Sequence, residues 1–222
     1  MTDIVFMGPP GVGKGTQAVV LAERAGLIHL ASGDLLRANI RDQTELGLLA
    51  KSYVDSGGLV PDELVVDMVL DRMLDAVATL LDGFPRTVAQ AVELDRRFAL
   101  AHRRIDAAVL LTAPRPTLIR RIVGRRSCRQ CRAQINIYHS PSRVEGICDV
   151  CGGKLMTRSD DNTATAQLRL DVYDDQTRPL VEHYRAAGVL REVEGTGEPA
   201  EVGSRIVAAL AAASPHPMVG SP

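Results

Sequence analysis

The 222-residue sequence has no tryptophan, and aromatic residues of all kinds make up only 3%. Proteins that bind single-stranded nucleic acid stack bases on several aromatic rings, so the composition disfavours that class. A formal net charge of −1 is also unlike the broadly basic surface that binds nucleic acid through its phosphates. With 45% hydrophobic and 24% charged residues, the chain is of the globular type rather than the disordered type.

Long hydrophobic runs are missing as well. One of the longest, residues 206–213, is far shorter than the ~20 apolar residues that a membrane-spanning helix needs. The first residues, MTDIVFMG, do not show a basic region followed by an apolar one, which a secretory signal would have. We therefore expect a soluble, cytoplasmic protein.

Lysine is scarce: only Lys14, Lys51 and Lys154 contribute to the 26 basic residues, and the rest are arginine. The planar guanidinium group of arginine matches two phosphate oxygens at once. The composition is therefore compatible with phosphate chemistry.

Short apolar runs alternate with helix-like segments along most of the chain. Alternation of this kind predicts an α/β fold with a central parallel sheet flanked by helices. The predicted strands are Ile4 to Met7, Leu27 to Leu30, Thr79 to Leu81, Ala107 to Leu111 and Val189 to Val193. Residues 32–60 are predicted to form short helices without a strand, and residues 125–160 have little periodicity, so both are interpreted as insertions. The proline-rich segment 214–222 is expected to be disordered.

Residues 8–15, GPPGVGKG, match the phosphate-loop spacing G-x-x-x-x-G-K. Glycines let backbone N–H groups face phosphate oxygens, the next helix presents its positive end, and Lys14 adds a charge. A plain Gly/Pro turn is the alternative, but strand, loop, lysine and helix together favour phosphate binding. Gly15 stands where Ser or Thr is usual, and Thr16 comes one position later than that pattern. A magnesium ion is therefore expected to be held mainly by nucleotide and water.

Four cysteines follow the pattern C-x2-C, sixteen residues, C-x2-C, which is typical of a tetrahedral zinc site. They are Cys128, Cys131, Cys148 and Cys151. Two disulfides are the alternative, which is disfavoured because thiols stay reduced in the compartment expected for this chain. A site with four protein ligands has no open position, so the zinc would be structural.

A helix is predicted from about Pro116 through the segment RIVGRR (121–126). Arg121 and Arg125 are four residues apart and would share one face of that helix, where an anion would relieve their repulsion. A solvated basic face is the alternative interpretation.

Six segments in the same order resemble the adenylate kinase family in its long-lid form. They are GPPGVGKGTQ (8–17), ASGDLLR (31–37), GLVPDELVV (58–66), DGFPRT (82–87), RIVGRR (121–126) and RSDDN (158–162). The resemblance implies a P-loop core at 1–31, 62–124 and 163–213, a helical AMP-binding insertion at 32–61, and a zinc-binding lid insertion at 125–162. It also implies a monomer that catalyses ATP + AMP ⇌ 2 ADP with Mg²⁺.

The resemblance assigns roles to individual residues. The implied ATP-binding residues are Gly11, Val12, Gly13, Lys14, Gly15, Thr16, Arg121, Arg125, Ile135 and Gly197. The implied AMP-binding residues are Ser32, Arg37, Gly58, Leu59, Val60, Gly83, Phe84, Pro85, Arg86, Gln90, Arg158 and Arg169, with Gln90 contacting the adenine edge. The implied catalytic residues are Lys14, Arg86, Arg121, Arg125, Arg158 and Arg169, while Asp34 and Asp82 would hold magnesium-bound water.

The chain departs from the family pattern at a few positions. Ile135 and Asn136 stand where Tyr-His is common, with Tyr138 and His139 three places later, and Gly197 stands where Lys or Gln is often found. The contact with the ATP base is therefore expected to differ. Two other functions stay open: a kinase for a different nucleoside monophosphate, and a zinc-containing nucleotide-binding module without turnover.

Overall fold

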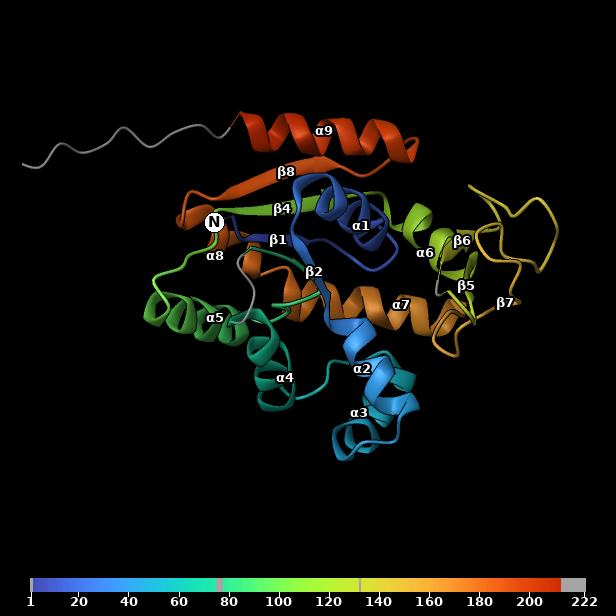
Figure 1. The fold of residues 1–222 in the computed structure, drawn as a ribbon, viewed down its shortest axis with the longest axis horizontal. Coiled ribbons are helices and arrows are strands. Elements are labelled where there is room, and N and C mark those ends of the chain that lie inside the picture. The colour runs from blue at the N-terminus through green and yellow to red at the C-terminus, as the bar shows by residue number, and fades with distance from the viewer. Residues whose placement is uncertain (1, 75–77, 132, 213–222) are drawn as a thin grey trace, which may run out of the picture.

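A five-stranded parallel sheet forms the centre of the protein (Figure 1). The computed structural model describes residues 2–74, 78–131 and 133–212, so the predicted disordered tail at 214–222 lies outside the described residues. In sheet order the strands are β2 (Ile28–Ala31), β3 (Thr79–Asp82), β1 (Ile4–Met7), β4 (Ala107–Thr112) and β8 (Leu190–Glu194). The predicted parallel sheet is confirmed, and each strand lies within one residue of its predicted bounds.

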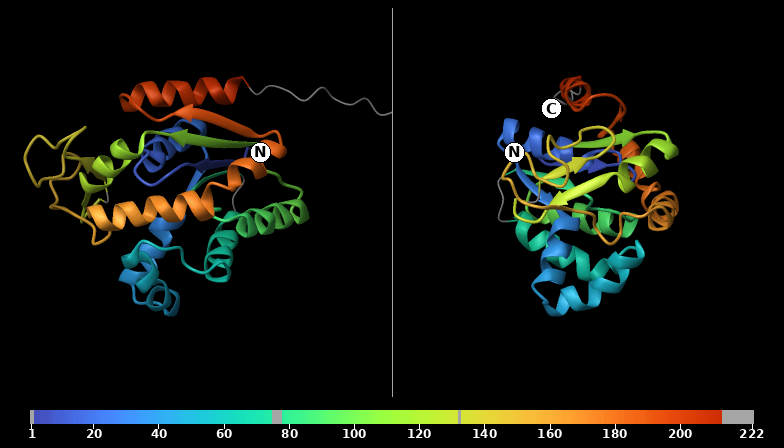
Figure 2. Two further views of the ribbon diagram at one scale, coloured as in Figure 1. Left: turned by 180° about the vertical axis from the view of Figure 1, so that it is seen from behind. Right: turned by 90° about the vertical axis from the view of Figure 1, so that its right-hand side faces the viewer.

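Both faces of the sheet are covered by helices, so alternate residues of each strand enter different cores (Figure 2). Val5 and Met7 pack with α4, α5 and α8, whereas Ile4 and Phe6 pack with α1 and α9. Burial on two faces explains why the central strands β1 and β4 are continuous apolar runs in the sequence. The helices are α1 (Lys14–Ala25), α4 (Asp62–Leu74), α5 (Val88–Leu100), α8 (Leu180–Ala186) and α9 (Pro199–Ala211).

The first insertion consists of α2 (Ser32–Arg41) and α3 (Glu45–Ser56), which project away from the sheet (Figure 1). Thr44 caps α3 by accepting a hydrogen bond from the backbone N–H of Gly47. A Cβ on Gly47 would lie only 2.1 Å from the carbonyl oxygen of Asn39, so glycine permits the close approach of the two helices. The prediction of short helices without a strand is confirmed.

The second insertion lies between α6 (Arg115–Val123) and α7 (Thr163–Val172), two helices that pack against each other. It contains an antiparallel sheet in the order β6-β5-β7, formed by β5 (Arg125–Cys128), β6 (Gln134–Asn136) and β7 (Leu155–Met156). A π-helix, Tyr173–Thr177, follows α7 directly. The sequence did not predict this small sheet, because strands of two to four residues leave too short a pattern to recognise.

The register of the central sheet brings two sequence motifs together. Phe6 of β1 pairs with Asp82 of β3, so the loop after β1 and the segment after β3 leave the same edge. Strand order reverses beside β1, and ligands of open α/β sheets bind at the carboxyl ends of strands at such a point. Within the described ranges, every helix falls short of the length or apolar character that a bilayer crossing needs.

Candidate active site

The loop between β1 and α1 wraps around the side chain of Lys14. Its Nζ donates hydrogen bonds to the carbonyl oxygens of Gly8 at 2.6 Å and Pro9 at 3.0 Å. Gly11 has a φ of +82°, and a Cβ there would lie 2.7 Å from the carbonyl oxygen of Leu118. Burial lowers the pKa of Lys14 to about 8, while nearby Asp82 opposes that effect. The charge of Lys14 is therefore costly until a phosphate replaces the carbonyl partners.

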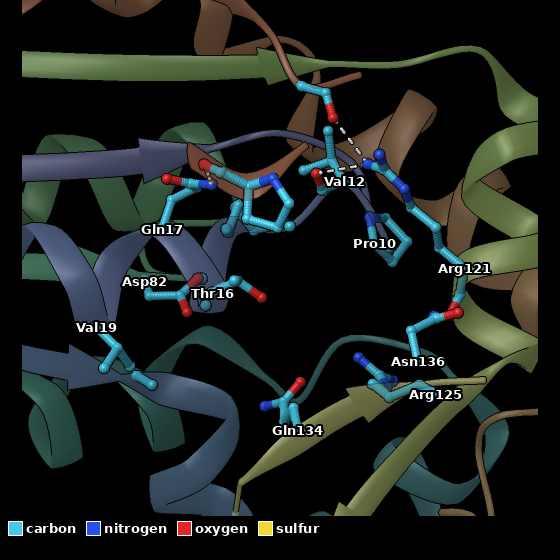
Figure 3. A pocket seen from close by; sticks show the side chains of 18 of the residues that line it. Pro10, Val12, Thr16, Gln17, Val19, Asp82, Arg121, Arg125, Gln134 and Asn136 are labelled. Atoms are coloured by element: carbon cyan, nitrogen blue, oxygen red, sulfur yellow. Dashed lines mark hydrogen bonds between the residues drawn. The ribbon is translucent and has the colours of Figure 1, made fainter. Parts of the chain in front are cut away.

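A cavity of about 370 Å³ lies in front of this loop (Figure 3). All residues expected to bind ATP line it: Gly11, Val12, Gly13, Lys14, Gly15, Thr16, Arg121, Arg125, Ile135 and Gly197. The basic side chains in its lining outnumber the acidic ones, seven to three: Lys14, Arg37, Arg86, Arg121, Arg125, Arg158 and Arg169 against Asp34, Asp82 and Glu198. This excess of positive charge suits a polyanionic ligand.

Arg121 and Arg125 do not share a helical face, so that prediction was wrong. Helix α6 ends at Val123, and Arg125 begins strand β5 after the turn at Gly124. The guanidinium of Arg121 donates hydrogen bonds to the carbonyl oxygens of Val12 and Gly195, at 3.1 Å and 2.8 Å (Figure 3). The two arginines nevertheless line one cavity, because the chain turns between them.

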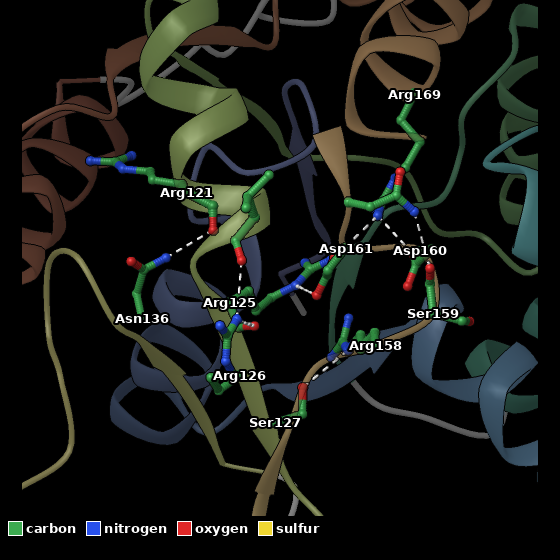
Figure 4. A network of polar contacts seen from close by, with 12 residues as sticks. Arg121, Arg125, Arg126, Ser127, Asn136, Arg158, Ser159, Asp160, Asp161 and Arg169 are labelled. Atoms are coloured by element: carbon green, nitrogen blue, oxygen red, sulfur yellow. Dashed lines mark hydrogen bonds and ion pairs between the residues drawn. The ribbon is translucent and has the colours of Figure 1, made fainter. Parts of the chain in front are cut away.

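Two consecutive buried carboxylates hold the arginines at the base of the second insertion (Figure 4). Arg125 Nε donates to Asp161 at 2.8 Å, and its Nη2 makes a second bond to the same carboxylate. Arg169 donates to Asp160 at 2.7 Å, and Arg158 Nε donates to the Ser127 hydroxyl at 3.1 Å. The two carboxylates therefore orient Arg125 and Arg169 at the cavity, and the Ser127 hydroxyl orients Arg158.

The pKa shifts of the arginines follow from their crowding. Burial and, to a smaller extent, the neighbouring arginines Arg37 and Arg125 together lower the pKa of Arg158 to about 10. The pKa of Arg86 is also lowered to about 10 by burial, with Arg169 as the largest cationic contributor. Burial lowers the pKa of Arg125, but the hydrogen bonds and the charge of Asp161 outweigh burial, so the pKa of Arg125 is raised. An anion in the cavity would relieve the repulsion that remains.

A smaller cavity, of about 60 Å³, adjoins the first insertion. Among the residues expected to bind AMP, its lining contains Ser32, Arg37, Gly58, Leu59, Val60, Arg86, Gln90 and Arg169, and the larger cavity contains Gly83 and Arg158. Among the described residues expected to bind AMP, Phe84 and Pro85 line neither the larger nor the smaller cavity. Phe84 is instead fully buried in the core beneath the site, because it follows β3 and faces inward.

The two carboxylates expected near magnesium have different surroundings. Asp34 pairs with Arg37 at 2.5 Å; burial alone would raise the pKa of Asp34, but Arg37 lowers it. Asp82, with a side chain 14% exposed, lies 3.6 Å from Nε2 of His29. Both carboxylates line the larger cavity, where their oxygens could accept hydrogen bonds from magnesium-bound water.

The far end of the larger cavity departs from the expected family pattern. Ile135, Asn136 and His139 line it together with Gly197. The Asn136 amide donates to the carbonyl oxygen of Arg121 at 2.8 Å and accepts from the backbone N–H of Tyr138 at 3.0 Å. These bonds tie the Asn136 side chain to the backbone of Arg121 and Tyr138. The turn that follows places His139 in the cavity lining.

The four cysteines converge on one point. Their Sγ atoms all lie within 4.8 Å of one another, with Cys128–Cys151 at 3.5 Å and Cys131–Cys148 at 3.6 Å. A tetrahedron with Zn–S bonds of about 2.3 Å has S···S edges of about 3.8 Å, whereas a disulfide needs about 2.05 Å. The thiols are free, and Gln130 N–H approaches Cys128 Sγ at 3.4 Å. The donor set therefore fits zinc and not two disulfides.

Sequence reasoning missed two contributions to the site. Asp160 and Asp161 received no role from the sequence, whereas they are the buried partners of Arg169 and Arg125. The arrival of His139 at the cavity was also not predicted. The adjacent acids in RSDDN were the available signal for Asp160 and Asp161. The position of His139 depends on a turn that the sequence does not reveal.

Comparisons with known proteins agree with this geometry. The family model described as "Adenylate kinase" matches residues 6–189. The chain is 47% identical over 210 residues to an adenylate kinase of Lachnospira eligens, covering 93% of this chain and 99% of that protein. It is 47% identical to that of Carboxydothermus hydrogenoformans (93% and 98% covered) and 48% identical to that of Streptomyces avermitilis (93% and 96% covered). The phosphate loop, the arginine-lined cavity and these similarities together show that the chain belongs to the adenylate kinase family.

Proposed function

We propose that the larger cavity binds ATP, the smaller cavity binds AMP, and the chain transfers the terminal phosphoryl group between them: ATP + AMP ⇌ 2 ADP. The observation that carries this proposal is that Arg37, Arg86 and Arg169 line both cavities. Two nucleotides in these cavities would bring their phosphates together at the shared arginines. As a family member, the chain is a nucleoside monophosphate kinase.

The reaction needs no general base from the protein. An AMP phosphate oxygen, already ionised near neutral pH, forms a bond to the γ-phosphorus of ATP while the bond from that phosphorus to the β–γ bridging oxygen breaks, and this oxygen leaves with ADP. Catalysis then consists of alignment and charge stabilisation, which preorganised cations supply. The residues proposed to act in this way are Lys14, Arg86, Arg121, Arg125, Arg158 and Arg169.

The family uses Mg²⁺ with ATP, and the residues placed to hold magnesium-bound water are Asp34 and Asp82. The metal supplies charge neutralisation at the phosphate oxygens when it is bound. Closure of residues 125–162 over the cavity excludes water, which otherwise competes as the phosphoryl acceptor.

Several finer assignments belong to the same proposal. Residues 32–61 form the AMP-binding insertion, and residues 125–162 form the lid around the core segments 1–31, 62–124 and 163–213. Zinc at the four cysteines is structural, because among the described residues of the lid the buried cluster comprises Cys128, Cys148 and Leu155, with Ala133 and Ile135 partly buried against it. We also propose a monomer that acts in the cytoplasm, where the cysteines stay reduced.

Acceptor preference tests the proposal most directly. The purified protein is supplied with ATP, Mg²⁺ and one of AMP, GMP, CMP or UMP, and ADP is measured in a coupled assay. The proposal expects AMP to give the highest kcat/KM. Preference for another acceptor would assign the chain to a different nucleoside monophosphate, and absence of turnover with all four would favour a binding module.

Two substitutions test the arginines. Arg86→Ala and Arg125→Ala are each expected to lower kcat by at least ~100-fold, because each removes a contact to the charge that develops in transfer. Arg126→Ala is the matched control, since Arg126 is adjacent on β5 but donates to the backbone carbonyls of Val123 and Arg125. Unchanged turnover in the first two variants contradicts the assignment.

A further inference from the structure

The side-chain amide of Gln90, the residue proposed to contact the adenine of AMP, belongs to a closed set of hydrogen bonds behind the smaller cavity. Gln90 is 2% exposed and lines that cavity. Its Nε2 donates to Asp62 Oδ1 at 2.6 Å, and its Oε1 accepts from the backbone N–H of Arg86 at 2.7 Å. The other carboxylate oxygen of Asp62 accepts from the Thr87 hydroxyl at 2.7 Å, and Thr87 in turn accepts from Gln90 N–H at 3.2 Å.

These partners determine which way the amide faces. An ionised carboxylate can only accept and a backbone N–H can only donate, so the NH2 group must face Asp62 and the carbonyl must face Arg86. Each end of the amide keeps one unused position: an N–H on Nε2 and a lone pair on Oε1. The amide therefore presents a donor and an acceptor in a fixed order.

We infer that Asp62 is a positioning residue that sets the acceptor-base selectivity of the enzyme through Gln90. This inference rests on the proposed function and deepens it. Asp62, at the first position of α4, is outside the residues that line the cavity, so it acts without touching AMP.

The fixed order suits one purine edge and opposes another. Adenine offers an amino donor at N6 and an acceptor at N1, which match the free acceptor and donor of Gln90. Hypoxanthine has the same size but carries an acceptor at O6 and a hydrogen on N1, so it matches only an amide turned by 180°. A turned amide would direct its NH2 at Arg86 N–H and its carbonyl at Asp62, leaving two buried repulsive contacts. Discrimination between AMP and IMP is the property that Asp62 enforces.

The test compares kcat/KM for AMP and for IMP in variants at position 62. Asp62→Leu removes the acceptor, and we expect the AMP:IMP ratio to fall about tenfold, the scale of one lost hydrogen bond. The fall appears in KM for AMP, while KM for ATP is unchanged. Asp62→Asn retains an oxygen for Gln90 and can turn its own NH2 to the Thr87 hydroxyl, so it preserves most of the ratio. Asp62→Ala repeats the test with a smaller side chain if Asp62→Leu does not fold.

Two controls separate positioning from a loss of structure. Glu63→Leu makes the same change at an exposed position in the same first turn of α4, and its AMP:IMP ratio stays that of the wild type. In a Gln90→Leu background, Asp62→Leu causes no further fall, because its effect passes through the amide.

Each result can be distinguished from failure of the proposed function. If the unaltered protein does not turn over AMP, the proposed function itself is at fault. If it turns over AMP but does not prefer AMP to IMP, the inference about Asp62 is overturned while the function stands. If it prefers AMP but Asp62→Leu keeps the same ratio, or Asp62→Asn loses as much as Asp62→Leu, the inference about Asp62 is overturned while the function stands.

Discussion

Asp161 accepts two hydrogen bonds from Arg125, although the two residues are 36 positions apart and belong to opposite ends of the second insertion. The Asp161 side chain has no exposed surface, and that of Arg125 is 17% exposed. The pair therefore joins the entry and exit of this insertion at the point where a catalytic cation is proposed to act.

Asp161→Asn is expected to destabilise the protein by about 3 kcal/mol, because it leaves the buried guanidinium of Arg125 without its charged partner. Urea denaturation measures the change. Asp149→Asn is the control: Asp149 pairs with Arg143, whose side chain is 82% exposed, and the cost there should be small. Equal effects of the two substitutions would show that burial of the pair is unimportant.

ATP affinity is expected to weaken as pH rises through the lowered pKa of Lys14, which is about 8. Phosphate binding favours the protonated amine, so at pH 9 only about a tenth of the free protein is in the competent form and the apparent Kd rises roughly tenfold from its value at pH 7. Titration calorimetry of ATP at both pH values measures this change.

Lys14→Met is the control for that experiment, and its Kd should lose this pH dependence. A wild-type affinity that is constant from pH 7 to 9 is the contrary result.

The same lowered pKa gives a stability effect of defined sign. Between about pH 8 and the ordinary lysine pKa of 10.5, the unfolded chain binds a proton that the folded chain does not, so the contribution of this group to the free energy of unfolding increases with pH.

Cys148→Ser is expected to lower the melting temperature far more than it alters phosphoryl transfer, because Cys148 is 1% exposed and belongs to the small lid core. Loss of a structural zinc site removes binding free energy that contributes to folding. Thermal denaturation is measured with and without a chelator, alongside zinc content. The chelator should lower the wild-type melting temperature toward that of the variant and leave the variant unchanged; identical wild-type curves contradict the assignment.

Gly11→Ala is expected to reduce stability more than Gly188→Ala. Both glycines have positive φ values, +82° and +73°, so each substitution introduces backbone strain of about 1 kcal/mol. Only at Gly11 would the added Cβ also meet backbone, 2.7 Å from the Leu118 carbonyl oxygen; nothing lies within 4 Å at Gly188. Chemical denaturation of both variants gives the comparison, and equal losses would show that the phosphate loop relaxes to accept a side chain.

The parts of the structure that could be predicted from sequence are those set by local pattern. The five core strands are apolar runs bounded by turn residues, and the phosphate loop and the cysteine spacing are local motifs. Arg121 and Arg125 were assigned to one helix because a four-residue spacing suits a helix, but Gly124 ends α6 between them. Asp161 could not be recognised as the partner of Arg125, since that contact exists only after the lid folds back on itself.

Helices α6 and α7 pack side by side, and residues 125–162 leave the core from one and return through the other. A segment with adjacent attachment points can be exchanged for that of a relative without rerouting the rest of the chain. Chimaeras can therefore be made at these two junctions, provided that the Asp161–Arg125 pair is transferred intact. The exchanged segment would then supply the thermal stability of the insertion, and the remaining chain would supply the acceptor preference.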